Sequence, residues 1–208
     1  MGFIISSLIF ISVNKLPFIS YGDWGINNIN QNKVANIINN YTINYNSKFN
    51  LVLGDNFYNE GINSIYDEQW KTTYRDVYKN NNTWYVLLGN HDYYGNYSAE
   101  IDYTGTDSRW KIFNNNYAIN PIKNYSLKII MLDTQLLDPK CSQVSESITN
   151  ESKKKQIYEW LKNELKTKEK VKIVAGHSGI YNIGEHSNCE ELIKDLFPIL
   201  LNYDVKLY

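Results

Sequence analysis

The sequence predicts an α/β fold, and the order of its apolar segments is the main reason. Short apolar runs alternate along the 208 residues with longer segments whose apolar residues recur at helical spacing. Strands that alternate with helices are typical of an α/β domain. Hydrophobic residues make up 43% of the chain and charged residues 21%, which suits a protein with a sizeable buried core. Because neither a repeat nor a linker interrupts the pattern, we expect one domain over residues 15–208.

The expected strands are short and rich in aliphatic residues. They span residues 16–21, 51–53, 84–88, 127–132, 171–175 and 204–207. The expected helices span residues 31–45, 67–78, 152–168 and 190–201. The third helix has the clearest pattern, an apolar stripe at helical spacing formed by Ile157, Trp160, Leu161 and Leu165.

Residues 1–14 favour a secretory signal sequence or its remnant. The apolar stretch over residues 3–13 has the length of a signal core and is too short to span a bilayer. A basic segment and a small-x-small cleavage site are missing, so an extra strand and a mis-set start remain alternatives. Two cysteines and several glycosylation sequons, including the one at Asn96, also fit the secretory pathway. We therefore expect the protein to be secreted or to reside in an acidic vesicle or vacuole.

The near-neutral net charge argues against partners that bind through a strong positive electrostatic field. The formal net charge is −1, so no global field favours nucleic acid or an anionic membrane. The lysine run at residues 153–155 opens an expected helix and is interpreted as a solvated face. We expect no nucleic-acid partner, no firm membrane span and a monomer.

Four expected strands end in a glycine that is followed by a residue able to bind metal or move a proton. These residues are Asp23, then Asp55 with Tyr58, then Asn90 with His91 and Asp92, and finally His177. Any one of these segments could be an ordinary turn, but the carboxyl ends of strands in α/β sheets are where ligands bind. Carboxylates, a phenol, an amide oxygen and imidazoles suit a pair of transition-type cations, with Asp55 as the bridge. Two-metal sites of this kind serve phosphoryl hydrolysis.

The segments GDWG, GDNFY, GNHD and VAGHSG resemble the successive signatures of the purple acid phosphatases, within the calcineurin-like metallophosphoesterases. The similarity runs from about Phe18 to the end of the chain and is strongest to the small tartrate-resistant type. Gly25 stands where most metallophosphoesterases have a histidine, and Tyr58 takes a metal-ligand place, a swap specific to the purple acid phosphatases. The resemblance implies a sandwich of mixed β-sheets flanked by helices.

The resemblance also implies a site with two metal ions. Fe(III) would be held by Asp23, Asp55 and Tyr58, and Fe(II), with Zn or Mn as alternatives, by Asp55, Asn90 and His177. His91 and His186 would contact the phosphate or protonate the leaving group, and Asp92 would orient His91. The substrate would be a small phosphomonoester or a phosphoprotein. Cys141 and Cys189 match cysteines that are disulfide-bonded in the tartrate-resistant type.

One departure from the family is large. The family completes its site with a Gly-His-x-His motif, and the sequence stops at Tyr208 before that motif. We therefore expect the 208-residue chain alone to bind metal weakly and to show little phosphatase activity. Three functions are compatible with the sequence: an acid phosphatase, which we favour, a catalytically silent phosphatase-like scaffold of the glideosome-associated type, and a metallophosphodiesterase.

Overall fold

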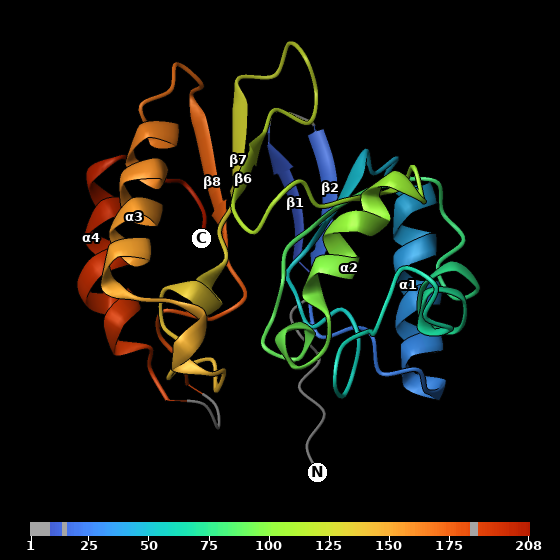
Figure 1. The fold of residues 1–208 in the computed structure, drawn as a ribbon. Coiled ribbons are helices and arrows are strands. Elements are labelled where there is room, and N and C mark those ends of the chain that lie inside the picture. The colour runs from blue at the N-terminus through green and yellow to red at the C-terminus, as the bar shows by residue number, and fades with distance from the viewer. Residues whose placement is uncertain (1–8, 14–15, 184–186) are drawn as a thin grey trace. The chain divides into compact units, whose positions relative to one another are not determined.

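The computed structural model describes residues 9–13, 16–183 and 187–208, and the chain divides into two compact units (Figure 1). The first unit is Met1–Phe113 and the second is Asn114–Tyr208. Each unit has a sheet and helices of its own, so the predicted α/β class with mixed sheets is confirmed. The expectation of one domain over residues 15–208 stays a prediction.

The first unit contains a five-stranded sheet in the order β1-β2-β3-β4-β5. The strands are β1 Ile9–Val13, β2 Leu16–Tyr21, β3 Phe49–Val52, β4 Thr83–Val86 and β5 Trp110–Lys111. Strands β2 to β5 are parallel, and β1 pairs with β2 antiparallel. Since β2, β3 and β4 are parallel neighbours, their carboxyl ends lie at one edge, where the loops with the predicted ligands begin. Strand β1 falls within the predicted signal segment, and cleavage of that segment stays a prediction.

Five helical segments complete the first unit. They are α1 Ile29–Asn44, the π-helix η1 Trp70–Arg75, the 3-10 helices η2 Asp92–Tyr94 and η3 Tyr103–Gly105, and α2 Tyr97–Asp102. Helix α1 begins after Asn28, whose side chain accepts hydrogen bonds from the backbone N–H groups of Asn30 and Gln31. Such a cap satisfies amides that have no partner inside the helix. Ala35 and Ile38 are the apolar residues that α1 buries.

The predicted helix over residues 67–78 contains the π-helix η1. The N–H of Asp76 donates to the carbonyl of Lys71, five residues back, at 2.9 Å. This wider turn places Trp70 and Tyr74 in the aromatic core, where Trp70 stacks on Tyr103 with a centroid distance of 3.4 Å. The packing of these two side chains in the core therefore explains why η1 is a π-helix and not an α-helix.

Tryptophans dominate the core of the first unit. Trp70, Trp84 and Trp110 are at most 1% exposed. Trp24, the residue after the predicted ligand Asp23, makes edge-on contacts with Tyr78 and Trp84, each with ring centroids 5.2 Å apart. Edge-to-face pairs add to the stabilisation that burial provides. The loop after β2 is thus anchored in the core by the neighbour of its ligand.

The second unit contains a three-stranded sheet, β6 Tyr117–Ile119, β7 Leu127–Met131 and β8 Val171–Ala175. Strand β6 is antiparallel to β7, and β7 is parallel to β8. The helical segments are η4 Thr134–Leu136, η5 Glu146–Ile148, α3 Glu151–Leu165, the π-helix η6 Leu192–Leu196 and α4 Phe197–Asn202. Figure 1 shows α3 and α4 on the same side of β8. The predicted strand over residues 171–175 is confirmed, and β7 is one residue shorter than predicted.

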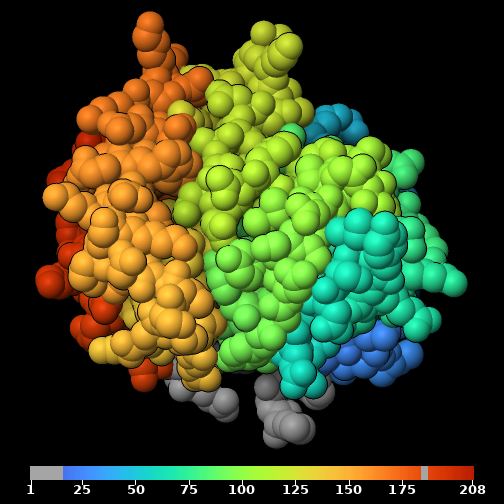
Figure 2. All heavy atoms as spheres, viewed as in Figure 1, coloured from blue at the N-terminus to red at the C-terminus, as the bar shows by residue number. Residues whose placement is uncertain are grey.

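Helix α3 confirms most of the predicted apolar stripe. Ile157, Leu161 and Leu165 are buried, whereas the prediction that Trp160 shares this core position is wrong. Trp160 is half-buried because it lies beside the row formed by the other three, and it borders a hollow of about 300 Å³. The other residues that line this hollow are Asn114, Asn115, Asn116, Leu136, Lys153, Gln156 and Ile157. Lys153 and Lys155 are exposed as predicted, whereas the prediction is wrong for Lys154, which is half-buried and forms an ion pair with Glu191. Helix α3 is drawn in orange in Figure 2.

Two C-terminal elements differ from their predictions. The helix over residues 190–201 is divided into η6 and α4, because Pro198 has no N–H to donate one turn back and the N–H of Phe197 reaches Leu192 instead. The strand over residues 204–207 is reduced to one bridge between Leu207 and Ile173. Asp204 has a φ of 54°, which is incompatible with an extended strand at that residue.

Candidate metal centre

The loops after β2 and β3 bring three predicted oxygen ligands together in the first unit. The hydroxyl of Tyr58 lies 2.6 Å from Oδ2 of Asp55 and 2.9 Å from Oδ1 of Asp23. Asp55 is 3% exposed, whereas Asp23 faces solvent. Two carboxylates and a phenol that meet in this way form a compact set of oxygen donors, which fits a cation of the kind that the sequence suggests.

Backbone strain accompanies this cluster. Asp23 has a φ of 53° and Asp55 a φ of 50°, a region that costs a side-chain-bearing residue about 1 kcal/mol or more. Hydrogen bonds hold the two loops in this shape: the N–H of Asp23 donates to the carbonyl of Gly54, and the N–H of Tyr58 donates to the carbonyl of Gly25, both at 3.0 Å. Strained residues cluster at functional sites, so the conformation supports a functional role for both carboxylates.

Close approach explains two of the glycines in the loops. A Cβ on Gly89 would lie 2.2 Å from Oδ1 of Asp55, and a Cβ on Gly25 would lie 1.8 Å from the carbonyl oxygen of Asn56. Both distances are far below van der Waals contact. A side chain at either position would therefore push a ligand-bearing loop out of place.

His91 and Asn90, in the loop after β4, lie at the same edge of the sheet. The N–H of His91 donates to Oδ1 of Asp55 at 3.0 Å, and its ring lies 4.3 Å from the ring of Tyr58 by centroid distance. Its Nε2 is 3.9 Å from Oδ2 of Asp55. The half-buried Asn90 directly precedes His91. The structure thus brings His91 next to Asp55 and Tyr58, as predicted.

Asp92 is completely buried, and its observed bonds reach backbone and amide N–H groups. Its carboxylate accepts from the N–H of Gly89 at 2.7 Å, from the N–H and Nδ2 of Asn56 at 2.8 and 3.1 Å, and from the N–H of Phe57 at 3.3 Å. It therefore ties the loop after β3 to the loop after β4. The expected role of Asp92 in orienting His91 stays a prediction, because the bond seen at the His91 ring joins Nδ1 to the carbonyl of Asn59, at 2.5 Å.

Electrostatics keep the phenol of Tyr58 protonated when no cation is bound. Burial raises the pKa of Tyr58 well above its usual value, and the charges of Asp55 and Asp23 raise it further. A cation bound by these three groups would favour the deprotonated phenolate of Tyr58, since metal binding releases protons from its ligands.

In the second unit, His177 follows β8 as predicted and is half-buried. The neighbouring Ser178 fixes the start of this loop. Its N–H donates to Oγ1 of Thr134 at 3.0 Å, and its carbonyl accepts from the hydroxyl of Tyr208 at 2.7 Å. His186, the other predicted histidine, lies outside the described residues.

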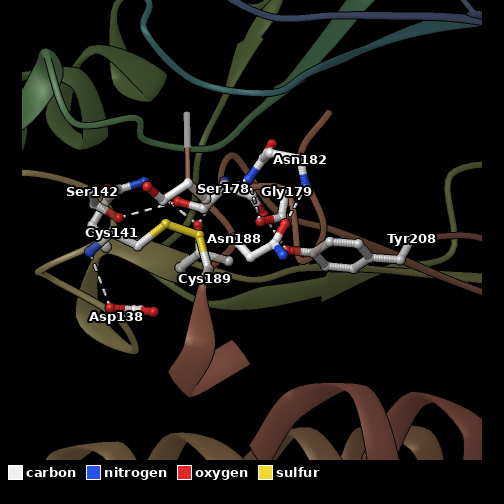
Figure 3. Close-up of a disulfide and its surroundings, with 12 residues drawn as sticks. Asp138, Cys141, Ser142, Ser178, Gly179, Asn182, Asn188, Cys189 and Tyr208 are labelled. Atoms are coloured by element: carbon white, nitrogen blue, oxygen red, sulfur yellow. Dashed lines mark hydrogen bonds between the residues drawn. A yellow bond between two sulfur atoms is a disulfide. The ribbon is translucent and has the colours of Figure 1, made fainter. Parts of the chain in front are cut away.

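Cys141 and Cys189 form a disulfide with Cα atoms 5.4 Å apart, which confirms the predicted pairing (Figure 3). The bond joins the loop after β7 to the loop after β8. Nearby, the N–H of Cys141 donates to Oδ1 of Asp138 at 3.1 Å, and the hydroxyls of Ser142 and Ser178 lie 3.1 Å apart. The disulfide therefore restrains the segment that begins at His177.

Two residues of the first unit that hold the loops were missed in the sequence. Asn56 stands between Asp55 and Phe57 with a fully buried amide, and Glu100 on α2 is also completely buried. Asn56 could have been noticed as a polar residue inside the GDNFY motif. Nothing in the sequence marks Glu100, because it becomes relevant only through a contact across 44 residues.

A model of the calcineurin-like phosphoesterase family matches residues 16–208. The chain belongs to this family. Among the helices described, none is both long enough and apolar enough to cross a bilayer.

Curated relatives narrow the similarity within this family. The chain is 35% identical to human and 34% identical to rabbit tartrate-resistant acid phosphatase type 5, over 93% of its own length and 65% of theirs. It is 29% identical to purple acid phosphatase 7 of Arabidopsis thaliana, over 95% of its length and 63% of that protein. The chain thus spans slightly less than two thirds of these relatives.

A solved structure shares the fold of this calcineurin-like phosphoesterase. It is described as GAP50, the anchor in the inner membrane complex of Plasmodium, and it matches with a TM-score of 0.80 and 26% sequence identity. The match covers 93% of this chain and 64% of that one.

Proposed function

We propose that the chain belongs to an acid phosphatase that hydrolyses phosphomonoesters at a dinuclear metal centre. The observation that carries the proposal is the Tyr58 hydroxyl placed between Asp55 and Asp23, at 2.6 and 2.9 Å. The similarity to a purple acid phosphatase supports it, because the resemblance of the sequence motifs to that group implies that these three residues hold one metal. The substrate would be a small phosphomonoester or a phosphoprotein.

Each metal would be held by a defined set of residues. Asp23, Asp55 and Tyr58 would hold Fe(III), and Asp55, Asn90 and His177 would hold Fe(II), Zn or Mn. When bound, the two ions would stabilise the negative charge that develops on the phosphoryl group. His186 would contact the phosphate.

His91 is the proposed proton donor to the leaving group. The carbonyl of Asn59 can only accept a hydrogen bond, so the short contact with Nδ1 assigns a proton to that nitrogen. Nε2 is then the atom that holds a second proton and gives it to the departing alkoxide. Because this role requires a proton on Nε2, activity should fall as pH rises.

The test uses leaving groups of different basicity. His91→Ala should lower the turnover of an alkyl phosphate by about 10²–10⁴-fold, because a poor leaving group needs a proton. Turnover of 4-nitrophenyl phosphate should fall much less, and metal content should stay at the level of the unmodified protein. Tyr94→Phe, which alters a ring that contacts His91 edge-on, is the matched control. An equal loss for both substrates would contradict the role of His91, and loss of metal would make His91 a ligand.

The same assay addresses the Gly-His-x-His motif expected of the family. We expect the 208-residue chain to bind metal weakly, and a chain that continues with the natural sequence after Tyr208 to bind it tightly if that sequence supplies the motif. Metal content and aryl-phosphate hydrolysis are compared for the two proteins. Full activity of the shorter protein would show that those histidines are dispensable.

A catalytically silent scaffold is the second candidate. The similarity to GAP50, an anchor in the inner membrane complex of Plasmodium, supports it. The presence of Asp23, Asp55, Tyr58, Asn90 and His177 argues against it, since a scaffold does not need to keep metal ligands. Stoichiometric metal binding without turnover of any phosphoester would favour the scaffold, and turnover would exclude it.

The secretory pathway is the proposed location. The disulfide between Cys141 and Cys189 supports it, because disulfides persist in oxidising compartments. Cleavage of residues 1–14 and glycosylation of Asn96 are parts of the same proposal. Glycosidase treatment followed by N-terminal sequencing of the secreted protein would test both.

A further inference from the structure

A buried acid on α2 lies behind the loops of the candidate metal centre. Glu100 is 0% exposed, and its Oε2 accepts a hydrogen bond from Nδ2 of Asn56 at 2.9 Å. Its Oε1 has no hydrogen-bond partner among the described residues. An ionised carboxylate in such a place would be very costly, because burial removes its hydration.

The surroundings of Glu100 keep it neutral. Burial raises the pKa of Glu100 well above its usual value, and the negative charge of Asp92 raises it further. Asp55 adds a smaller contribution in the same direction. Fully buried beside a group of the same sign, Glu100 therefore holds a proton.

Asn56 connects this acid pair to all three ligand-bearing loops of the first unit. Its Oδ1 accepts from the indole N–H of Trp24 at 3.1 Å, next to Asp23 in the loop after β2. Its Nδ2 also lies 3.0 Å from the carbonyl of Leu87 and 3.1 Å from Oδ2 of Asp92, in the loop after β4. Asn56 itself follows Asp55. The amide group of one residue therefore meets three loops and the acid on α2.

We propose that Glu100 is a positioning residue for the ligand-bearing loops of the first unit. As a neutral acid it accepts a hydrogen bond from Asn56, the residue that meets all three loops, and so fixes the loops that carry Asp23, Asp55 and Asn90. The proposal about the loops does not depend on the reaction, whereas its consequence for metal affinity rests on the proposed function.

Two substitutions test whether Glu100 acts as a neutral hydrogen-bonding group or as an ionised carboxylate. Glu100→Gln keeps a donor and an acceptor without a charge, and Glu100→Leu keeps the volume but loses both. Thr104→Val is the control, because it removes the hydroxyl that bonds to Ile112 in the neighbouring segment without touching the acid pair. The readouts are hydrogen exchange at the amides of Asn56 and Gly89, which donate to Asp92, and the affinity for Zn²⁺ by calorimetry.

Glu100→Leu should accelerate exchange at both amides by about tenfold or more and weaken Zn²⁺ binding by about 10–100-fold, the usual effect of residues that orient metal ligands. Glu100→Gln should stay within about threefold of the unmodified protein in both measurements, and Thr104→Val should leave the two amides unchanged. If Glu100→Leu does not fold, Glu100→Asp, which withdraws the acid by one methylene group, replaces it with the same expectation.

Three results would overturn the proposal. Unchanged exchange in Glu100→Leu would mean that Glu100 does not hold the loops. If Glu100→Gln accelerated exchange and weakened Zn²⁺ binding as much as Glu100→Leu does, the ionised form would be required. Equal damage in Thr104→Val would mean that the effect is general loss of stability. Zn²⁺ affinity is measured on the chain that continues with the natural sequence after Tyr208. Failure of that unmodified chain to bind Zn²⁺ would count against the proposed function alone, because the exchange measurements would still decide the role of Glu100.

Discussion

The two units restrain the loops at their strand ends by different means. In the first unit, the hydrogen bonds that Asn56 donates to Asp92 and Glu100 tie the loops to one another. The core of this unit contains buried tryptophans. In the second unit, a covalent bond between Cys141 and Cys189 joins the loops after β7 and β8. A polar network depends on every partner, whereas a disulfide depends on one bond. Substitutions should therefore act differently in the two units, and the three that follow are ordered by expected effect.

Removal of the disulfide should have the largest effect on stability. The two cysteines are separated by 48 residues, and closing such a loop contributes about 4 kcal/mol to the free energy of unfolding in the chain-entropy model. Replacing both cysteines with serine should lower the stability of the second unit by up to that amount. Hydrogen exchange, resolved by peptide, would show the loss in residues 114–208. Alkylation of both thiols without prior reduction would contradict the pairing itself.

Gly25→Ala should be the most damaging small substitution in the first unit. The new Cβ would meet the carbonyl of Asn56 at 1.8 Å, and backbone must move to relieve the clash, at a cost of about 3 kcal/mol. Gly105→Ala, where nothing lies within 4 Å, should change stability by less than about 0.5 kcal/mol. Urea unfolding followed by tryptophan fluorescence suits this pair, since four of the five tryptophans precede Asn114. Similar midpoints for the two variants would refute the close packing of the loops.

Loss of a helix cap should have the smallest effect and can be compared between the units. Asn28 caps α1 through Asn30 and Gln31, and Asn150 caps α3 through the N–H of Lys153 at 2.9 Å. Asn28→Ala and Asn150→Ala should each cost about 1 kcal/mol, because each leaves helix amides without a partner. Peptide-resolved exchange should place each loss in the unit that holds the helix. Losses of equal size in both units from either change would mean that the units unfold together.

Strands were predicted well from the sequence where they were both buried and at least five residues long. Residues 16–21 and 171–175 match β2 and β8 because each is a mostly apolar run followed by a glycine. The strands β5 and β6 were missed because two or three residues carry too little periodicity to be recognised. The ligand positions in the first unit were predictable because each follows a strand directly.

Contacts between distant segments were beyond the sequence. The bond between Asn56 and Glu100 joins residues 44 apart. Asn56 stands inside the GDNFY motif, but nothing in the sequence links it to Glu100. The same limit applies to His91, since the partner at its Nδ1, the carbonyl of Asn59, is a backbone atom that no motif reveals. The π-helix η1 could not be predicted from the sequence either, because it depends on how Trp70 and Tyr74 pack in the core.

The visible absorption spectrum of the protein loaded with Fe(III) tests the candidate metal centre most directly. Tyr58 is placed to bind the ion together with Asp23 and Asp55, so we predict a band from charge transfer between its phenolate and the iron. Tyr58→Phe should lose this band while circular dichroism stays unchanged, and Tyr94→Phe, the control near His91, should keep it. A band that persists in Tyr58→Phe would contradict the assignment of Tyr58 as a metal ligand and the site built around it.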